Sequence, residues 1–172
     1  RDYSKLRSEK EAVLVNRVML EMTVAHAKKH DASPGKGLKG KSQTQVCEWF
    51  AREHFVHANN TLNAEAEAIL RQLESECCGL QGTPGEQVGK KLQSLYKTLS
   101  EEIHHPDWGT LLPDGLYAGG VSRIVDAALG IWIVKAQRLG IIDFPVRLVG
   151  SDNQPGCEIR DGQVKKVLDT ST

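Results

Sequence analysis

The chain has 172 residues, of which 40% are hydrophobic and 26% charged, the composition of an ordinary globular protein. Lys and Arg together number 22, as do Asp and Glu, and this balance excludes a strong overall field for nucleic acid or an anionic membrane. Aromatic residues make up 5%, so Leu, Val, Ile and Ala must fill the core.

The length fits one domain, or one domain with a short appendage. The chain begins with Arg1 and shows no signal sequence, so we expect a domain of a longer protein or an N-terminally trimmed chain. The longest uncharged apolar run, residues 127–134, is far shorter than the roughly 20 residues that a membrane span needs. These observations predict no membrane span and an intracellular protein, cytoplasmic or nuclear.

The four cysteines also bear on the cellular location of the protein, because their redox state depends on the compartment. Cys77 and Cys78 are adjacent, a spacing that suits neither a mutual disulfide nor a zinc site. We therefore expect Cys47, Cys77, Cys78 and Cys157 to be reduced thiols.

The first three quarters of the chain carry helical periodicity. Residues 3–30 show an amphipathic pattern, and a Gly- and Lys-rich loop follows over residues 31–43. A second helix is predicted over residues 44–58, burying Val46, Trp49 and Phe50. A third begins after an N-cap at Asn63 and stops at Gly79, and a fourth runs from Pro84 to about His105.

Residues 107–120 read as a Gly- and Pro-punctuated connection that packs on the core. Residues 121–139 follow it, and their apolar side chains cover nearly the whole circumference of a helix. Such a helix belongs in the middle of a core, with other helices around it.

Short apolar runs replace the helical pattern after Gly140. Residues 144–149 suit a strand, and residues 157–160 and 163–167 suit a hairpin around an Asp161-Gly162 turn. The fold class predicted is mainly α, a bundle of about five helices around residues 121–139 with a small C-terminal β appendage. The division expected is a helical domain over 1–142 and the appendage over 143–172.

Residues 35–42, GKGLKGKS, match the spacing of a phosphate-binding P-loop. A P-loop needs a buried strand leading into it, whereas the residues before this one have the pattern of a helix end. We therefore predict no nucleotide site. The loop can still contact phosphate as a basic segment, which makes a nucleic-acid-binding module the second functional hypothesis, with contacts from Lys36, Lys39 and Lys41.

Histidines at helical spacing supply a third hypothesis, a metal-binding helical domain or an enzyme of unrecognised type. Two pairs lie three or four residues apart, so each pair shares a helix face: His26 with His30, and His54 with His57.

The leading hypothesis is a non-enzymatic protein–protein interaction or oligomerisation module with a regulatory or scaffolding role, whose partner is another protein or a second copy. No catalytic motif or cofactor signature supports an enzyme. The amphipathic helices supply faces for a partner, as does a row of large apolar residues in the predicted connection: Trp108, Leu111, Leu112, Leu116 and Tyr117.

Overall fold

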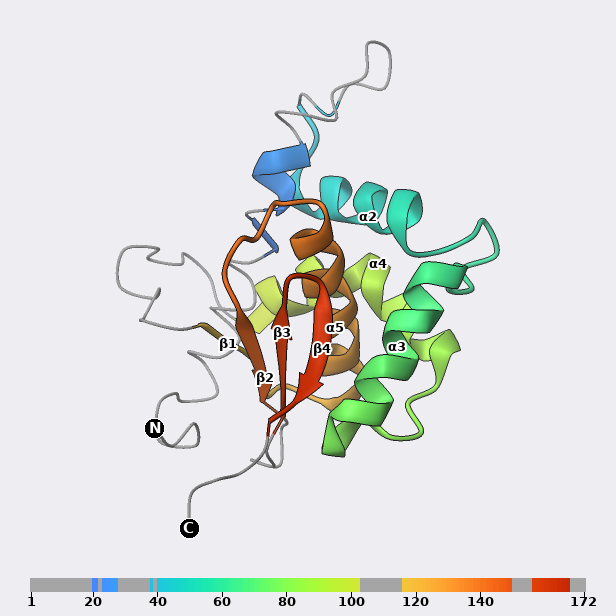
Figure 1. Cartoon of the computed structure of the whole chain (residues 1–172). Coiled ribbons are helices and arrows are strands. Elements are labelled where there is room, and N and C mark those ends of the chain that lie inside the picture. The colour runs from blue at the N-terminus through green and yellow to red at the C-terminus, as the bar shows by residue number, and fades with distance from the viewer. Residues whose placement is uncertain are drawn as a thin grey trace.

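The structure is a computed structural model that describes residues 20, 21, 23–27, 38, 40–102, 116–149 and 156–167 (Figure 1). Residues 20, 21 and 23–27 are helical. The elements that follow are α2 (Gln43–His54), α3 (Ala64–Glu76), the 3-10 helix η2 (Cys78–Leu80), α4 (Gly85–Glu102), β1 (Leu116–Gly119), α5 (Arg123–Arg138), β2 (Val146–Val149), β3 (Cys157–Arg160) and β4 (Gln163–Lys166). The described chain is mainly helical with one four-stranded sheet, which confirms the predicted fold class in its coarse form.

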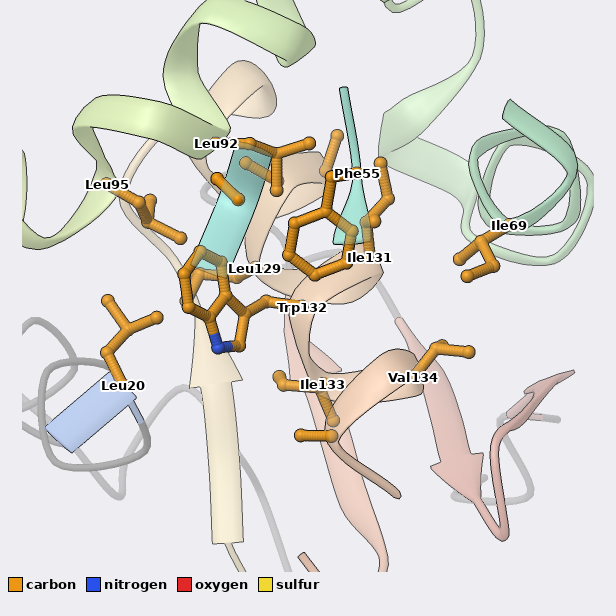
Figure 2. Packing of buried hydrophobic residues seen from close by; sticks show 14 of the residues in the cluster. Leu20, Phe55, Ile69, Leu92, Leu95, Leu129, Ile131, Trp132, Ile133 and Val134 are labelled. Carbon is orange, nitrogen blue, oxygen red and sulfur yellow. The ribbon is translucent and has the colours of Figure 1, made fainter. Parts of the chain in front are cut away.

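The predicted central helix is confirmed as α5. Its first turn is capped by Ser122, whose hydroxyl accepts a hydrogen bond from the Val125 N–H at 3.3 Å. Every residue from 125 to 134 is buried, and the side chains of this helix reach into the core on several sides (Figure 2). A helix that is apolar around most of its circumference is stable only when other elements cover it, and here helices and the sheet do so.

Helices α3 and α4 pack directly on α5, and α2 packs on α4. Aromatic rings join α2 and the residue after it directly to α5. The ring centroid of Trp132 on α5 lies 5.1 Å from that of Phe50 on α2 and 5.2 Å from that of Phe55. Such ring pairs add specific geometry to the area that they bury, so they fix how α2 sits over the central helix.

The N-terminal helical residues join the same core. Leu20, Val24 and Ala27 are buried, and the Thr23 hydroxyl accepts a hydrogen bond from Trp132 Nε1 at 3.0 Å. The helix predicted over residues 3–30 is thus confirmed where the structure describes it, and the rest of that range lies outside the described residues.

The sheet has the order β1-β2-β3-β4, with β1 parallel to β2 and the other pairs antiparallel. Helix α5 connects β1 to β2, because two parallel neighbours need a crossover between them. The same helix covers one face of the sheet (Figure 1). The inward positions of the strands hold buried side chains: Ala118, Val146, Leu148, Cys157 and Ile159.

The predicted hairpin is confirmed. β3 pairs with β4 from Cys157 opposite Lys166 to Arg160 opposite Gln163. The two turn residues, Asp161 and Gly162, have φ angles of 52° and 74°. Positive φ at both positions is what a two-residue hairpin turn requires, and an Asp-Gly pair adopts it at little cost.

Two differences in secondary structure from the sequence-based expectation stand out. β1 lies inside the segment expected to be an irregular connection, so part of the sheet comes from the chain before α5. Helix α2 ends at His54 rather than near residue 58, because the side chain of Asn63 donates a 2.7 Å hydrogen bond to the His54 carbonyl and closes the chain into a turn. The bundle arrangement and the division at residue 142 stay predictions, although β1 from the first part pairs with β2 from the second.

Candidate interaction surfaces

A groove of about 550 Å³ runs along the outward side of α2. We call it the α2 groove. Its lining residues are Leu38, Lys41, Gln45, Glu48, Trp49, Arg52 and Glu53. Most of them follow the three- and four-residue spacing of one helix face, which places them together on the surface.

Capping hydrogen bonds set the residue at which α2, and with it the lining of the α2 groove, begins. Ser42 caps α2, with its hydroxyl accepting from the Gln45 N–H at 3.2 Å while the Gln45 side chain accepts from the Ser42 N–H at 3.0 Å. This reciprocal capping box starts the helix at Gln43. Leu38 is buried just before it and anchors the incoming chain.

Trp49 was expected in the core and lies at its border instead. The opposite side of α2 is buried through Val46, Cys47, Phe50 and Ala51. The Trp49 side chain is half-buried, packing on the core with one part and lining the groove with the other. A tryptophan in this position offers a large, rigid apolar surface to a partner.

The charges of the α2 groove have both signs. Arg52 and Glu48 form an exposed ion pair at 3.1 Å, with 59% and 38% of their side chains accessible. Lys41 and Glu53 are also exposed, so two cations and two anions surround Trp49. Exposed pairs of this kind add little to folding stability, and their side chains can exchange partners.

A second groove of about 470 Å³ lies where α3, the start of α4 and the turn at residues 59–62 meet. Four of its charged residues form two ion pairs, Arg71 with Glu67 at 2.7 Å and Lys90 with Glu86 at 3.8 Å. Leu62 and Leu70 contribute apolar surface. No large aromatic side chain lines this groove, so it offers a partner less than the α2 groove does.

The residues of the basic loop are only partly described. Lys36 and Lys39 lie outside the described residues, whereas Lys41 is exposed at the mouth of the α2 groove. The hydroxyl of Ser42, which a P-loop would direct toward a metal ion, is engaged in capping α2. The residues described before the loop, 23–27, are helical, as their sequence pattern predicts, whereas a P-loop follows a strand.

The predicted apolar interaction surface falls mostly outside the described residues. Trp108, Leu111 and Leu112 lie there, and Leu116 and Tyr117 belong to β1. This surface stays a prediction.

The histidines predicted as metal ligands lie in different surroundings. His26 is half-buried in the N-terminal helix, and the ring of His54 lies 4.4 Å from that of Phe50 between centroids. His57 is exposed, and His30 lies outside the described residues. Within the described part of the chain no three His, Cys, Asp or Glu residues gather into a group that could hold a metal ion.

The expectation of reduced thiols is wrong for two of the four cysteines. Cys77, at the end of α3, and Cys157, on β3, form a disulfide across 80 residues of sequence, with their Cα atoms 5.2 Å apart. Both side chains are buried in the packed core. The pairing could not be foreseen because only the fold brings these residues together.

Cys47 is a free cysteine and is buried. Burial raises the pKa of its thiol far above the ordinary range, and the nearby carboxylates of Glu21 and Glu48 raise it further. The thiolate is the reactive form of cysteine, so Cys47 behaves as a core residue and not as a nucleophile.

A buried polar cluster lies beside Cys47. The Tyr96 hydroxyl on α4 donates to Glu21 Oε1 at 2.8 Å and also contacts the Gln43 side-chain amide. These bonds join the N-terminal helix, α2 and α4 through polar groups that apolar periodicity does not reveal. The Tyr96 hydroxyl thereby satisfies Oε1 of the buried Glu21 carboxylate.

These features define a mainly helical domain with a small mixed sheet and shallow surface grooves. Residues 8–165 match a family described as a domain of unknown function (DUF8249), and the chain belongs to that family. No curated protein and no solved structure is significantly similar to it. None of the described helices is long and apolar enough to cross a membrane.

Proposed function

We propose that this domain is a non-enzymatic protein-interaction module that self-associates through the α2 groove. The observation that carries the proposal is the half-buried Trp49, set in a groove of about 550 Å³ with two cations and two anions around it. Aromatic anchors flanked by charged rims are typical of protein interfaces.

The charge pattern favours a second copy of the chain as the occupant. A two-fold interface places the same surface on both sides, so that surface must be complementary to itself. Lys41 and Arg52 on one copy can meet Glu48 and Glu53 on the other without leaving excess charge. A groove of one sign would require a partner of the opposite sign instead.

The area of the α2 groove indicates how tightly two copies should associate. A stable standard interface buries about 800 Å² on each partner, and one helix face with its flanking loop supplies only part of that area. We therefore expect a dimer with a dissociation constant in the micromolar range.

Sedimentation velocity and native mass spectrometry from about 1 to about 200 µM protein test this proposal. We expect a concentration-dependent dimer, and Trp49→Ala should weaken it at least about tenfold. A monomer at every concentration overturns self-association. A dimer that Trp49→Ala leaves unchanged overturns the assignment of the surface.

Charge-reversal variants test the same surface without replacing Trp49, so they separate loss of dimerisation from loss of the fold. Arg52→Glu leaves one cation and three anions in the groove, and Glu53→Lys leaves three cations and one anion. Each variant alone should dimerise more weakly than the wild type, while a mixture of the two should form a heterodimer. Arg71→Glu, at a side chain 73% exposed on α3, is the matched control that should leave dimerisation unchanged.

A further inference from the structure

Among the described residues, no helix covers the outward face of the sheet. Helix α5 covers the opposite face, whereas this one is turned toward the viewer in Figure 1. We call it the open sheet face. By the strand register, its outward positions include three residues of β1 and β2, namely Tyr117, Gly119 and Val149, besides Arg147, Glu158, Arg160, Gln163 and Lys165.

Strand register aligns three of these residues in one row. Arg147 on β2 pairs with Glu158 on β3, which pairs with Lys165 on β4. Directly opposed residues on neighbouring strands have their side chains about 5 Å apart at Cβ. With Arg160, the outward neighbour of Glu158 along β3, three of the described cations lie near one described anion, a local positive excess in a chain with 22 basic and 22 acidic residues.

Glu158 organises the two arginines. Its Oε1 accepts from Arg160 Nε at 2.8 Å, and its Oε2 lies 3.5 Å from Arg147 Nε. Only the Nε of Arg160 takes part in its bond, and 58% of that side chain is exposed. Because the bond uses Nε, the terminal nitrogens of this exposed guanidinium are left as donors for a carboxylate.

We propose that the open sheet face binds an acidic segment of a partner protein. Arginine donates paired hydrogen bonds to carboxylates with good geometry, and Lys165 adds a mobile point charge beside them. The patch is small, with three cations, and the whole chain is neutral. A short Asp- or Glu-rich segment matches it better than a nucleic acid, whose binding draws on an extended positive field.

This surface is separate from the α2 groove, so the two proposals fail independently. Fluorescence anisotropy with a fluorescein-labelled oligo-glutamate peptide tests the open sheet face, using the full chain at low salt. We expect binding that weakens as salt rises from about 50 to about 200 mM, because exposed charges are screened. The double variant Arg160→Ala with Lys165→Ala should weaken binding about tenfold while dimerisation stays unchanged.

A matched double variant controls for overall charge. Arg71→Ala with Lys90→Ala also removes one arginine and one lysine, from exposed sites on α3 and α4. We expect it to change peptide binding by less than about twofold. Equal weakening by both doubles, or no peptide binding at low salt, overturns the proposal.

A short labelled oligo-uridine RNA tests whether the open sheet face binds nucleic acid instead of an acidic segment. If the RNA binds more tightly than the peptide, and the Arg160 and Lys165 substitutions abolish that binding, the face is a nucleic-acid surface and the acidic-segment proposal is overturned. Weaker binding of the RNA than of the peptide supports it. Circular dichroism of each variant confirms that the fold is retained.

Discussion

Gly162, in the turn between β3 and β4, donates its backbone N–H to Oε1 of Gln137 on α5 at 2.8 Å. The Nε2 group of Gln137 donates in turn to the carbonyls of Phe144 at 3.0 Å and Ile159 at 2.9 Å. One half-buried side chain thus satisfies three backbone groups from two segments and holds the end of the central helix against the sheet.

Gln137→Leu keeps the size of the side chain and removes all three hydrogen bonds. Each bond contributes about 1 kcal/mol, and the backbone groups left behind lose their partners, so we expect the free energy of unfolding to fall by about 2–3 kcal/mol. Urea denaturation followed by circular dichroism measures the change. Gln163→Leu, at an exposed position on β4, is the control and should change the stability by less than about 0.5 kcal/mol. A similar effect of both variants would contradict the role given to Gln137.

The Gln137 contact shows which features could be predicted from the sequence. The Asp161-Gly162 turn was predicted because its chemistry is local, and the structure confirms it. The partner of that turn lies 25 residues earlier, on a helix whose apolar periodicity gives no sign of a polar contact. β1 was missed for the same reason, since four residues become a strand only by pairing with β2 beyond the whole of α5.

The candidate surfaces depended on detail that periodicity does not supply. Apolar spacing placed both Trp49 and Phe50 inside, but Val46, Cys47, Phe50 and Ala51 are enough to fill the buried side of α2. Trp49 lies at the edge of the buried side of α2, and part of its side chain reaches the surface. The open sheet face required the strand register, which aligns Arg147, Glu158 and Lys165 from three separate segments.

The disulfide between Cys77 and Cys157 should stabilise the domain strongly. It closes a loop of 80 residues, and restricting a loop of that length in the unfolded chain contributes about 4 kcal/mol. We expect the double variant Cys77→Ala with Cys157→Ala to lose about that much free energy of unfolding. A reducing agent should destabilise the wild type similarly and leave the double variant unaffected.

Thiol alkylation of the unfolded, unreduced protein checks the pairing directly. Modification of only two of the four cysteines is expected, and modification of all four would contradict the disulfide. Protein disulfides persist in oxidising compartments, so the same measurement on protein taken from its native source tests the predicted intracellular location.

Glu65 links α3 to the last turns of α5. Its carboxylate accepts from Lys135 Nζ at 2.6 Å and from Arg138 Nη1 at 3.2 Å. The hydrogen bond from Lys135 is the main cause that lowers the pKa of Glu65, and Arg138 lowers it further. A carboxyl group with a lowered pKa in the folded state stabilises the fold above its unfolded pKa, and that contribution is lost as the pH falls through the folded pKa.

Glu65→Gln should therefore destabilise the domain at pH 7 and not at acidic pH. Because Glu65 is 38% exposed, we expect a loss of less than about 1 kcal/mol at neutral pH. The difference between variant and wild type should shrink as the pH falls below about 4. Urea denaturation at several pH values measures it, and a difference that is constant with pH would contradict the ion pairs.

Gly89 on α4 packs closely against the backbone of the turn at residues 57–61. A Cβ atom at this position would lie 2.6 Å from the carbonyl oxygen of Asn60. That backbone has little freedom to move, because the Asn60 N–H is bonded to the His57 carbonyl at 2.9 Å. Gly89→Ala gains up to about 1 kcal/mol of helix propensity and pays a steric cost of about 1–3 kcal/mol, so we expect a net loss of about 1–2 kcal/mol.

Gly85→Ala is the matched control on the same helix. The nearest atoms to a Cβ there are side-chain carbons of Leu62 at 3.6 Å and Leu70 at 3.9 Å, which is ordinary contact distance. We expect this variant to be neutral or slightly more stable than the wild type. Thermal and urea denaturation of both variants compare them directly. Equal stability of the two would show that the turn at Asn60 moves freely, and would contradict the close packing of α4 against it.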